Sequence, residues 1–131
     1  MGRAIAMMAI ALLLIGLGIA ETLYANNIIT TLVTQSAKID QLITAADEDT
    51  VNTPDITDRI DAVDKFWSAN QKIVTFIVNF EKIRLITETI EKLKVAVSEE
   101  DYSLSIENAR LLKFYSEHLN FVMGSDPSNI L

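Results

Sequence analysis

The stretch MMAIALLLIGLGIAETLYANN, residues 7–27, decides how the rest of the chain is organised. It can be read as a structural helix, a removable signal or a membrane anchor, and each reading places the remaining residues differently. A run of seventeen residues without a charge extends from Ala4 to Ala20. In a helix this run rises about 26 Å, slightly less than a hydrocarbon core of about 30 Å, and continuing to Tyr24 makes up the difference. We therefore expect a signal-anchor transmembrane helix over residues 1–24.

The charges that flank this segment predict its direction in the membrane. Arg3 precedes the segment, and the next basic residue after it is Lys38. Because cytoplasmic flanks of membrane helices are enriched in Lys and Arg, the N-terminus should stay inside and the rest should lie outside. The alternative is a cleaved signal peptide, with small residues at 18–20 as the cleavage site and a secreted helical domain as the product. The apolar run exceeds the usual signal-peptide core of about 7–15 residues, which favours an uncleaved anchor in the cytoplasmic membrane.

After the anchor, apolar residues recur at alternating steps of three and four, as they do on the buried face of an amphipathic helix. The four stripes consist of Ile29, Leu32, Ser36, Ile39, Leu42, Ile43 and Ala46; Ile56, Ile60, Val63, Phe66, Trp67, Ile73, Val74 and Ile77; Ile83, Ile86, Ile90, Leu93 and Val97; and Ala109, Leu111, Leu112, Phe114, Tyr115, Leu119 and Val122. The first stripe prolongs the membrane helix, and no window alternates like a strand. We predict an all-α chain in which the anchor continues into a small antiparallel bundle of about four helices, residues 25–123, followed by a tail, residues 124–131.

Cap residues predict several helix boundaries. Thr53 and Pro54 are typical of an N-cap and a first helical residue, so the second helix should begin there. Ser98 and Asp101 have the spacing of a capping box and should begin the fourth helix. The second helix should end near Asn79, but no Pro or Gly forces a break there, and the sequence leaves open whether the second and third helices are continuous.

The composition argues against several classes of function. The net charge is −7, and the first twenty residues contain only one of the eleven basic residues, so the remainder has a net charge of about −8 and no basic patch for nucleic acid. The chain has no Cys, and no Gly-rich loop that could hold a phosphate. His118 is the single His, and no carboxylate lies one turn before or after it to form a metal site. We expect no enzymatic activity, metal or cofactor.

A few residues are candidates for an interaction surface or a pocket. They are Trp67, Asn70, Asn79, His118, Ile130 and Leu131. Trp67 lies in the middle of its stripe, which is typical of a core anchor. Asn70 interrupts the same stripe, so it either sets the packing register or lines a ligand cavity between helices. Ile130 and Leu131 are apolar residues in a tail that should otherwise be solvated, so the tail either packs onto the bundle or docks on a partner.

Several short motifs occur in a characteristic order along the chain. They are Trp67, Lys72, Phe76, Asn79-Phe80-Glu81-Lys82-Ile83, Arg110-Leu111-Leu112-Lys113-Phe114, Glu117-His118-Leu119 and Asn129-Ile130-Leu131. In order and spacing they resemble domain of unknown function family 4363, which consists of short membrane-anchored proteins of Gram-positive, often spore-forming, bacteria. Members of that family usually have an Asn-His pair before the Glu, whereas here Phe80 follows Asn79. The resemblance implies an anchored extracytoplasmic helical domain and no biochemical activity.

These observations predict a single-pass protein that holds an acidic helical bundle outside the cytoplasmic membrane as a protein–protein interaction or scaffold module. The expected partners are the lipid bilayer, through residues 4–24, and another protein, either a membrane partner encoded nearby or a second copy in a homo-oligomer. One alternative is a sensor-like bundle that binds a small ligand. Another is an enzyme site assembled from His118 and scattered acids.

Overall fold

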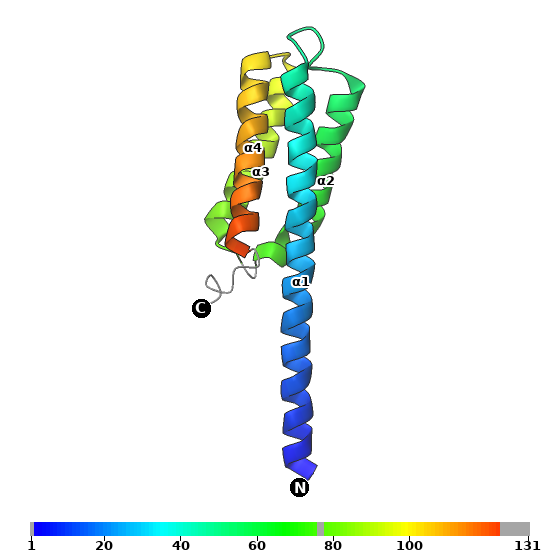
Figure 1. Cartoon of the computed structure of the whole chain (residues 1–131), viewed down its shortest axis with the longest axis vertical. Coiled ribbons are helices and arrows are strands. Elements are labelled where there is room, and N and C mark those ends of the chain that lie inside the picture. The colour runs from blue at the N-terminus through cyan, green and yellow to red at the C-terminus, as the bar shows by residue number, and fades with distance from the viewer. Residues whose placement is uncertain (1, 76–77, 124–131) are drawn as a thin grey trace.

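The computed structural model describes residues 2–75 and 78–123, without the side chains of residues 21, 22, 122 and 123, and this part of the chain is helical without strands. Four helices follow one another: α1, Gly2–Ala45; α2, Pro54–Thr75; α3, Phe80–Ser98; and α4, Tyr102–Met123. The upper half of α1 packs with the other three in an antiparallel four-helix bundle, and its lower half protrudes as a single rod (Figure 1). The predicted all-α fold is confirmed.

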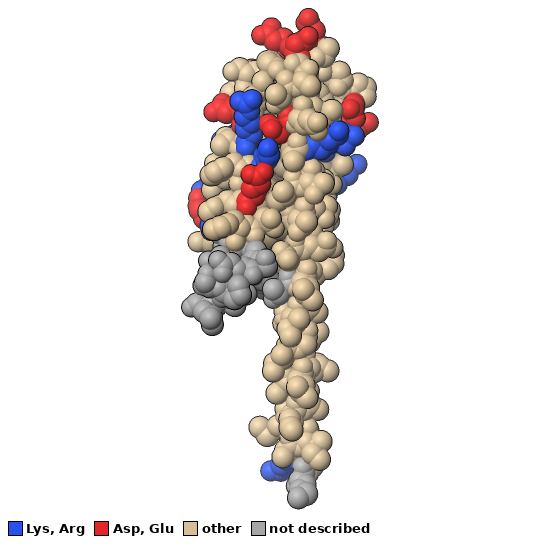
Figure 2. Space-filling model, viewed as in Figure 1, with Lys and Arg blue, Asp and Glu red and all other residues tan. Residues whose placement is uncertain are grey.

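We call the end of the bundle from which α1 protrudes the base, and the opposite end the tip. The α2–α3 junction and the end of α4 lie at the base, whereas the α1–α2 and α3–α4 connections lie at the tip (Figure 1). Acidic segments 47–49 and 99–101 are therefore brought together at the tip, where Figure 2 shows a concentration of Asp and Glu.

Helix α1 passes through two different surroundings. From Ala4 to Ala20 every residue is exposed, and α1 is long and apolar enough in this part to cross a membrane. From Ala25 onward one side of the helix is buried, and Leu32 and Ile43 have no exposed surface. Among the described side chains of α1, burial therefore begins one residue after Tyr24, the residue at which the sequence predicts the end of the anchor.

The core of the bundle contains most members of the four predicted stripes. Its largest fully buried side chains are Trp67, Ile29, Leu32, Ile39, Ile43, Ile60, Ile86, Ile90, Leu93, Leu112, Leu119 and Val51. Ile77 and the Val122 side chain lie outside the described part of the chain. The prediction that Phe114 flanks the core is wrong, because this ring is 61% exposed. Phe114 lies two residues after Leu112, which turns it about 200° around the helix and away from the core.

The α2–α3 junction settles whether these two helices are continuous. The described part of α2 ends at Thr75, residues 76 and 77 lie outside the described part, and α3 begins at Phe80. Asn79 is the N-cap of α3, and its side chain accepts a hydrogen bond of 2.9 Å from the Glu81 backbone N–H. Because this bond satisfies a backbone donor that the new helix leaves unpaired, Asn79 marks a helix start rather than a helix end.

The caps at the tip agree only partly with the sequence prediction. The Thr53 carbonyl accepts from the Thr57 N–H, so α2 begins at Pro54 as expected. Helix α4 begins after Asp101, whose carboxylate accepts from the Leu104 N–H at 3.1 Å. The predicted capping role of Ser98 is wrong, because Ser98 is the last residue of α3. Continuation of α3 through this residue removes it from the N-cap position.

Candidate functional site

The four predicted candidate residues that the structure describes do not converge on one site. Trp67 and Asn70 belong to α2, Asn79 caps α3, and His118 lies on α4. Ile130 and Leu131 lie outside the described residues.

Trp67 connects α2 to α3 inside the bundle. Its side chain is 1% exposed, and its Nε1–H donates to Thr87 Oγ1 at 2.9 Å. The Thr87 hydroxyl lies 3.1 Å from both Gln71 Oε1 and the Ile83 carbonyl oxygen, so it can donate to either acceptor. A buried indole with a satisfied N–H is a core anchor, as the sequence predicts.

Asn70 makes a local contact. Its Nδ2 donates to the Phe66 carbonyl oxygen, one turn earlier in α2, at 2.8 Å. The side chain is half-buried and lines none of the surface cavities described below. The bond within α2 is therefore the role that the structure assigns to Asn70.

A buried polar contact joins α1 to α4. Ser36 and Ser116 have no exposed surface, and their Oγ atoms lie 3.2 Å apart. Each Oγ also lies 2.7 Å from a carbonyl oxygen one turn earlier, that of Leu32 or Leu112. Each hydroxyl has one proton, so one serine can donate to its own helix while the other donates across the interface. Ser36 interrupts an apolar stripe in the sequence, whereas its pairing with Ser116 requires the register of two distant helices.

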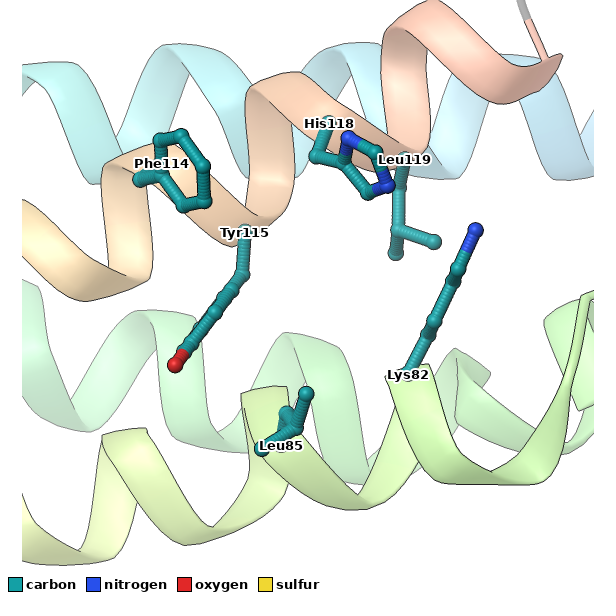
Figure 3. Close-up of a pocket in the computed structure, with 6 residues that line it drawn as sticks. All are labelled: Lys82, Leu85, Phe114, Tyr115, His118 and Leu119. Atoms are coloured by element: carbon teal, nitrogen blue, oxygen red, sulfur yellow. The ribbon is translucent and has the colours of Figure 1, made fainter.

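His118 borders an apolar cavity between α3 and α4. The cavity has a volume of ≈ 250 Å³ and is lined by Lys82, Leu85, Phe114, Tyr115, His118 and Leu119 (Figure 3). Lys82 extends from α3 towards the α4 side chains, and the His118 ring stacks on Phe114 with a centroid distance of 6.4 Å. The volume is below the usual range for drug-sized ligands, about 300–1,000 Å³. In the described part of the chain, no group of three His, Cys, Asp or Glu residues could hold a metal ion.

A second apolar stripe runs along α4 on the side away from the core. It consists of Leu104, Leu111, Phe114, His118 and Phe121, at spacings of seven, three, four and three, and we call it the outer α4 stripe. Leu104, Phe114 and Phe121 are 45%, 61% and 70% exposed. This stripe was not predicted from the sequence, because Leu111 and Phe114 were expected to flank the core.

The surface beside the outer α4 stripe is hollowed. A cavity of ≈ 330 Å³ includes Val95 and Leu104 in its lining, and one of ≈ 560 Å³ includes Leu111 and Phe114. The α3–α4 cavity adjoins the lower part of the stripe. Exposed apolar side chains next to hollows are the surface features that a packed helix uses, since its own side chains fill such hollows.

The solvent side of α2 has a different character. Helix α2 is described throughout and has no large apolar residue among its exposed side chains, which include Asp55, Asp58, Arg59, Lys65 and Lys72. Arg59 forms an ion pair with Asp55 one turn earlier. The apolar outer face of α4 is therefore not a general property of this bundle.

Among the described residues, two ion-pair groups connect neighbouring helices. Lys94 of α3 donates to Asp64 of α2 at 2.9 Å, and this hydrogen bond, with the attraction of the carboxylate, raises the pKa of Lys94 above its ordinary value. Asp40 of α1 lies 3.9 Å from both Arg110 and Lys113 of α4. These contacts stabilise helix pairs and do not converge on a catalytic constellation.

In comparisons with known protein families, curated proteins and solved structures, the chain matches none of them. The resemblance to domain of unknown function family 4363 stays a prediction.

Proposed function

We propose that this protein is a single-pass membrane-anchored module without catalytic activity, which binds a helix of another membrane protein through the outer α4 stripe. The N-terminus lies in the cytoplasm, and the bundle lies on the outer side of the membrane. The apolar face of α4 is the observation that carries the partner part of the proposal.

The anchor part rests on the lower half of α1. Eight of its residues between Ala4 and Ala20 are Leu or Ile, which together favour insertion by about 2–5 kcal/mol. Within the part of the chain that the structure describes, this apolar surface is not covered by the bundle. A bilayer removes it from water, and Arg3 before the segment favours a cytoplasmic N-terminus.

The shape of the outer α4 stripe favours a helical partner. Its members extend from residue 104 to residue 121, a rise of about 26 Å. Leu104, Leu111 and His118 are spaced by seven residues, as are Glu107, Phe114 and Phe121, which is the repeat of a coiled-coil seam. Because the bundle stands on a membrane helix, a partner anchored in the same membrane can align with the full length of the stripe.

Glu107 favours a different protein over a second copy as the partner. It is exposed and lies between Leu104 and Leu111 in the stripe. Two copies anchored in one membrane point the same way, so symmetric pairing through α4 would bring their two Glu107 side chains together. Like charges in facing positions are destabilising. We infer that the partner helix has a basic residue opposite Glu107.

A site-specific crosslinking experiment in native membranes tests this proposal. A photo-reactive phenylalanine replaces Phe114 in the outer α4 stripe and, as the matched control, Ala69 on the exposed side of α2. We expect one discrete adduct with a membrane-anchored protein from position 114 and none from position 69. Glu107→Lys should abolish the adduct, because it places a positive charge opposite the inferred basic residue.

Three outcomes would overturn the partner assignment. An adduct of twice the mass of the chain would identify a second copy as the partner. Equal adducts from positions 114 and 69 would show that the face of α4 is not selective. Absence of any adduct from a folded, membrane-bound protein would favour the ligand-binding alternative, with the cavity beside His118 as its site.

A further inference from the structure

We propose that Phe80, at the start of α3, inserts its ring into the headgroup layer of the membrane, so that the base of the bundle rests on the lipid surface. This inference rests on the anchor part of the proposed function and is independent of the protein partner. It concerns a surface at the base, separate from the outer α4 stripe.

The base of the bundle lies within reach of the lipid headgroups. Ala25 is fully buried, so packing of the bundle begins about 8 Å along α1 from Ala20, the last residue of the uncharged run. The polar layer of one leaflet is about 5–8 Å thick. The α2–α3 junction lies at this same end of the bundle (Figure 1), which brings the first residue of α3 to the level of the headgroups.

The ring of Phe80 is placed to enter this layer. It is 67% exposed, although the residue belongs to the bundle and follows the Asn79 cap directly. Side chains of a helix lean towards its N-terminus, and α3 runs from the base to the tip, so the Phe80 ring leans towards the membrane. Tyr24 is 51% exposed on α1 just below the bundle, and it supplies a second aromatic ring near the same level. Aromatic rings are stabilised at the boundary between hydrocarbon and water.

The charges of the bundle favour the same orientation. In the described part of the α2–α3 side of the base, residues 72–75 and 78–84 contain three basic residues, Lys72, Lys82 and Arg84, and one acidic residue, Glu81, which pairs with Arg84. The end of α4 adds Glu117. At the tip, all residues of the segments 47–49 and 99–101 are acidic (Figure 2). An anionic lipid surface attracts Lys and Arg and repels carboxylates, so it favours contact with the base and keeps the tip away.

Depth measurements on single-cysteine variants of the full-length protein test this inference, because the chain has no Cys of its own. An environment-sensitive NBD label is attached at Phe80→Cys, with the protein in vesicles of phosphatidylcholine and phosphatidylglycerol. Val95→Cys serves as the matched control, because Val95 is also an exposed apolar residue of α3 but lies near the tip. Leu14→Cys reports on the anchor.

We expect blue-shifted emission at position 80 and several-fold stronger quenching by headgroup-spin-labelled lipid than at position 95. Equal, water-like emission and quenching at positions 80 and 95, with Leu14→Cys protected in the bilayer, would overturn the Phe80 inference alone. Water-like emission at Leu14→Cys would overturn the anchor and, with it, the inference that rests on the anchor. Circular dichroism of each labelled variant confirms that the bundle is folded.

Discussion

The two halves of α1 have the same backbone structure and different surroundings. Between Ala4 and Ala20 all side chains are exposed and uncharged, whereas between Ala25 and Ala45 a buried stripe alternates with exposed polar residues. Backbone hydrogen bonds are satisfied within a helix in either half, in lipid or in water. The difference therefore lies only in what covers the side chains: bundle core on one face above, and by our proposal lipid on every face below.

The largest expected effect is a difference in the free energy of unfolding between two variants, each with one Leu→Ala substitution in a different half of α1. Leu32→Ala should lower the free energy of unfolding of the bundle by about 4 kcal/mol, because it leaves a cavity in the core. Leu14→Ala should leave that free energy unchanged, since Leu14 is exposed outside the bundle. Guanidinium unfolding in detergent micelles, followed by the fluorescence of Trp67, measures both. Equal losses of stability in the two variants would remove the distinction between the halves.

A charge in the lower half should disturb membrane insertion instead of the bundle. Leu14→Arg should weaken insertion by about 3 kcal/mol, most of the driving force of the segment. Carbonate extraction of membranes should then release much of the variant, while wild-type protein stays in the membrane fraction. Thr34→Arg, at an exposed position of the upper half, should behave like wild type. Full retention of Leu14→Arg would contradict the anchor.

Within the upper half, the cost of losing a hydroxyl should depend on the face of the helix. Ser36→Ala should destabilise the bundle by about 1 kcal/mol, because it removes the buried contact with Ser116. Thr30→Ala should cost less, since the Thr30 hydroxyl donates to the Asn26 carbonyl oxygen on the exposed face. The same unfolding assay compares them, and a larger loss for Thr30→Ala would show that the buried pair is not a stabilising contact.

The smallest expected effect is a pH dependence confined to the bundle. The Asp64 carboxylate raises the pKa of Lys94 above its ordinary value of 10.5, so its contribution to stability is fully present below that pH and is lost as the pH rises through the raised pKa. Between about pH 9 and pH 12, the range that brackets this loss, the free energy of unfolding should depend less on pH in Lys94→Met than in the wild type. An unchanged pH profile in that variant would assign the dependence to other groups.

Much of the fold was predictable, because buried faces leave a periodic pattern in the sequence. All five members of the third stripe, from Ile83 to Val97, are buried. Pro54 marked the start of α2, since its fixed backbone angle and missing N–H suit a first helical residue. The loop residues Val51 and Val78 are buried as well, but they belong to no stripe, so periodicity could not identify them.

The surface was less predictable than the core. Phe114 and Leu112 are both apolar, and the sequence alone gave them similar roles, although two residues of separation place them on opposite sides of α4. The Ser36–Ser116 contact joins residues that are eighty positions apart in the chain, so it depends on how α1 and α4 are aligned. The outer α4 stripe therefore emerged only once the core face of α4 was known.

Labelling of single cysteines with a membrane-impermeant maleimide tests the central claim most directly. Thr50→Cys places the label at the exposed tip, and Gly2→Cys places it at the other end of α1, where nothing lies within 4 Å of an added side-chain carbon. Our account predicts that intact cells are labelled at position 50, and that position 2 reacts only after permeabilisation, on a chain of full mass. Protection of position 50 in intact cells, or loss of position 2 from the mature chain, would contradict it.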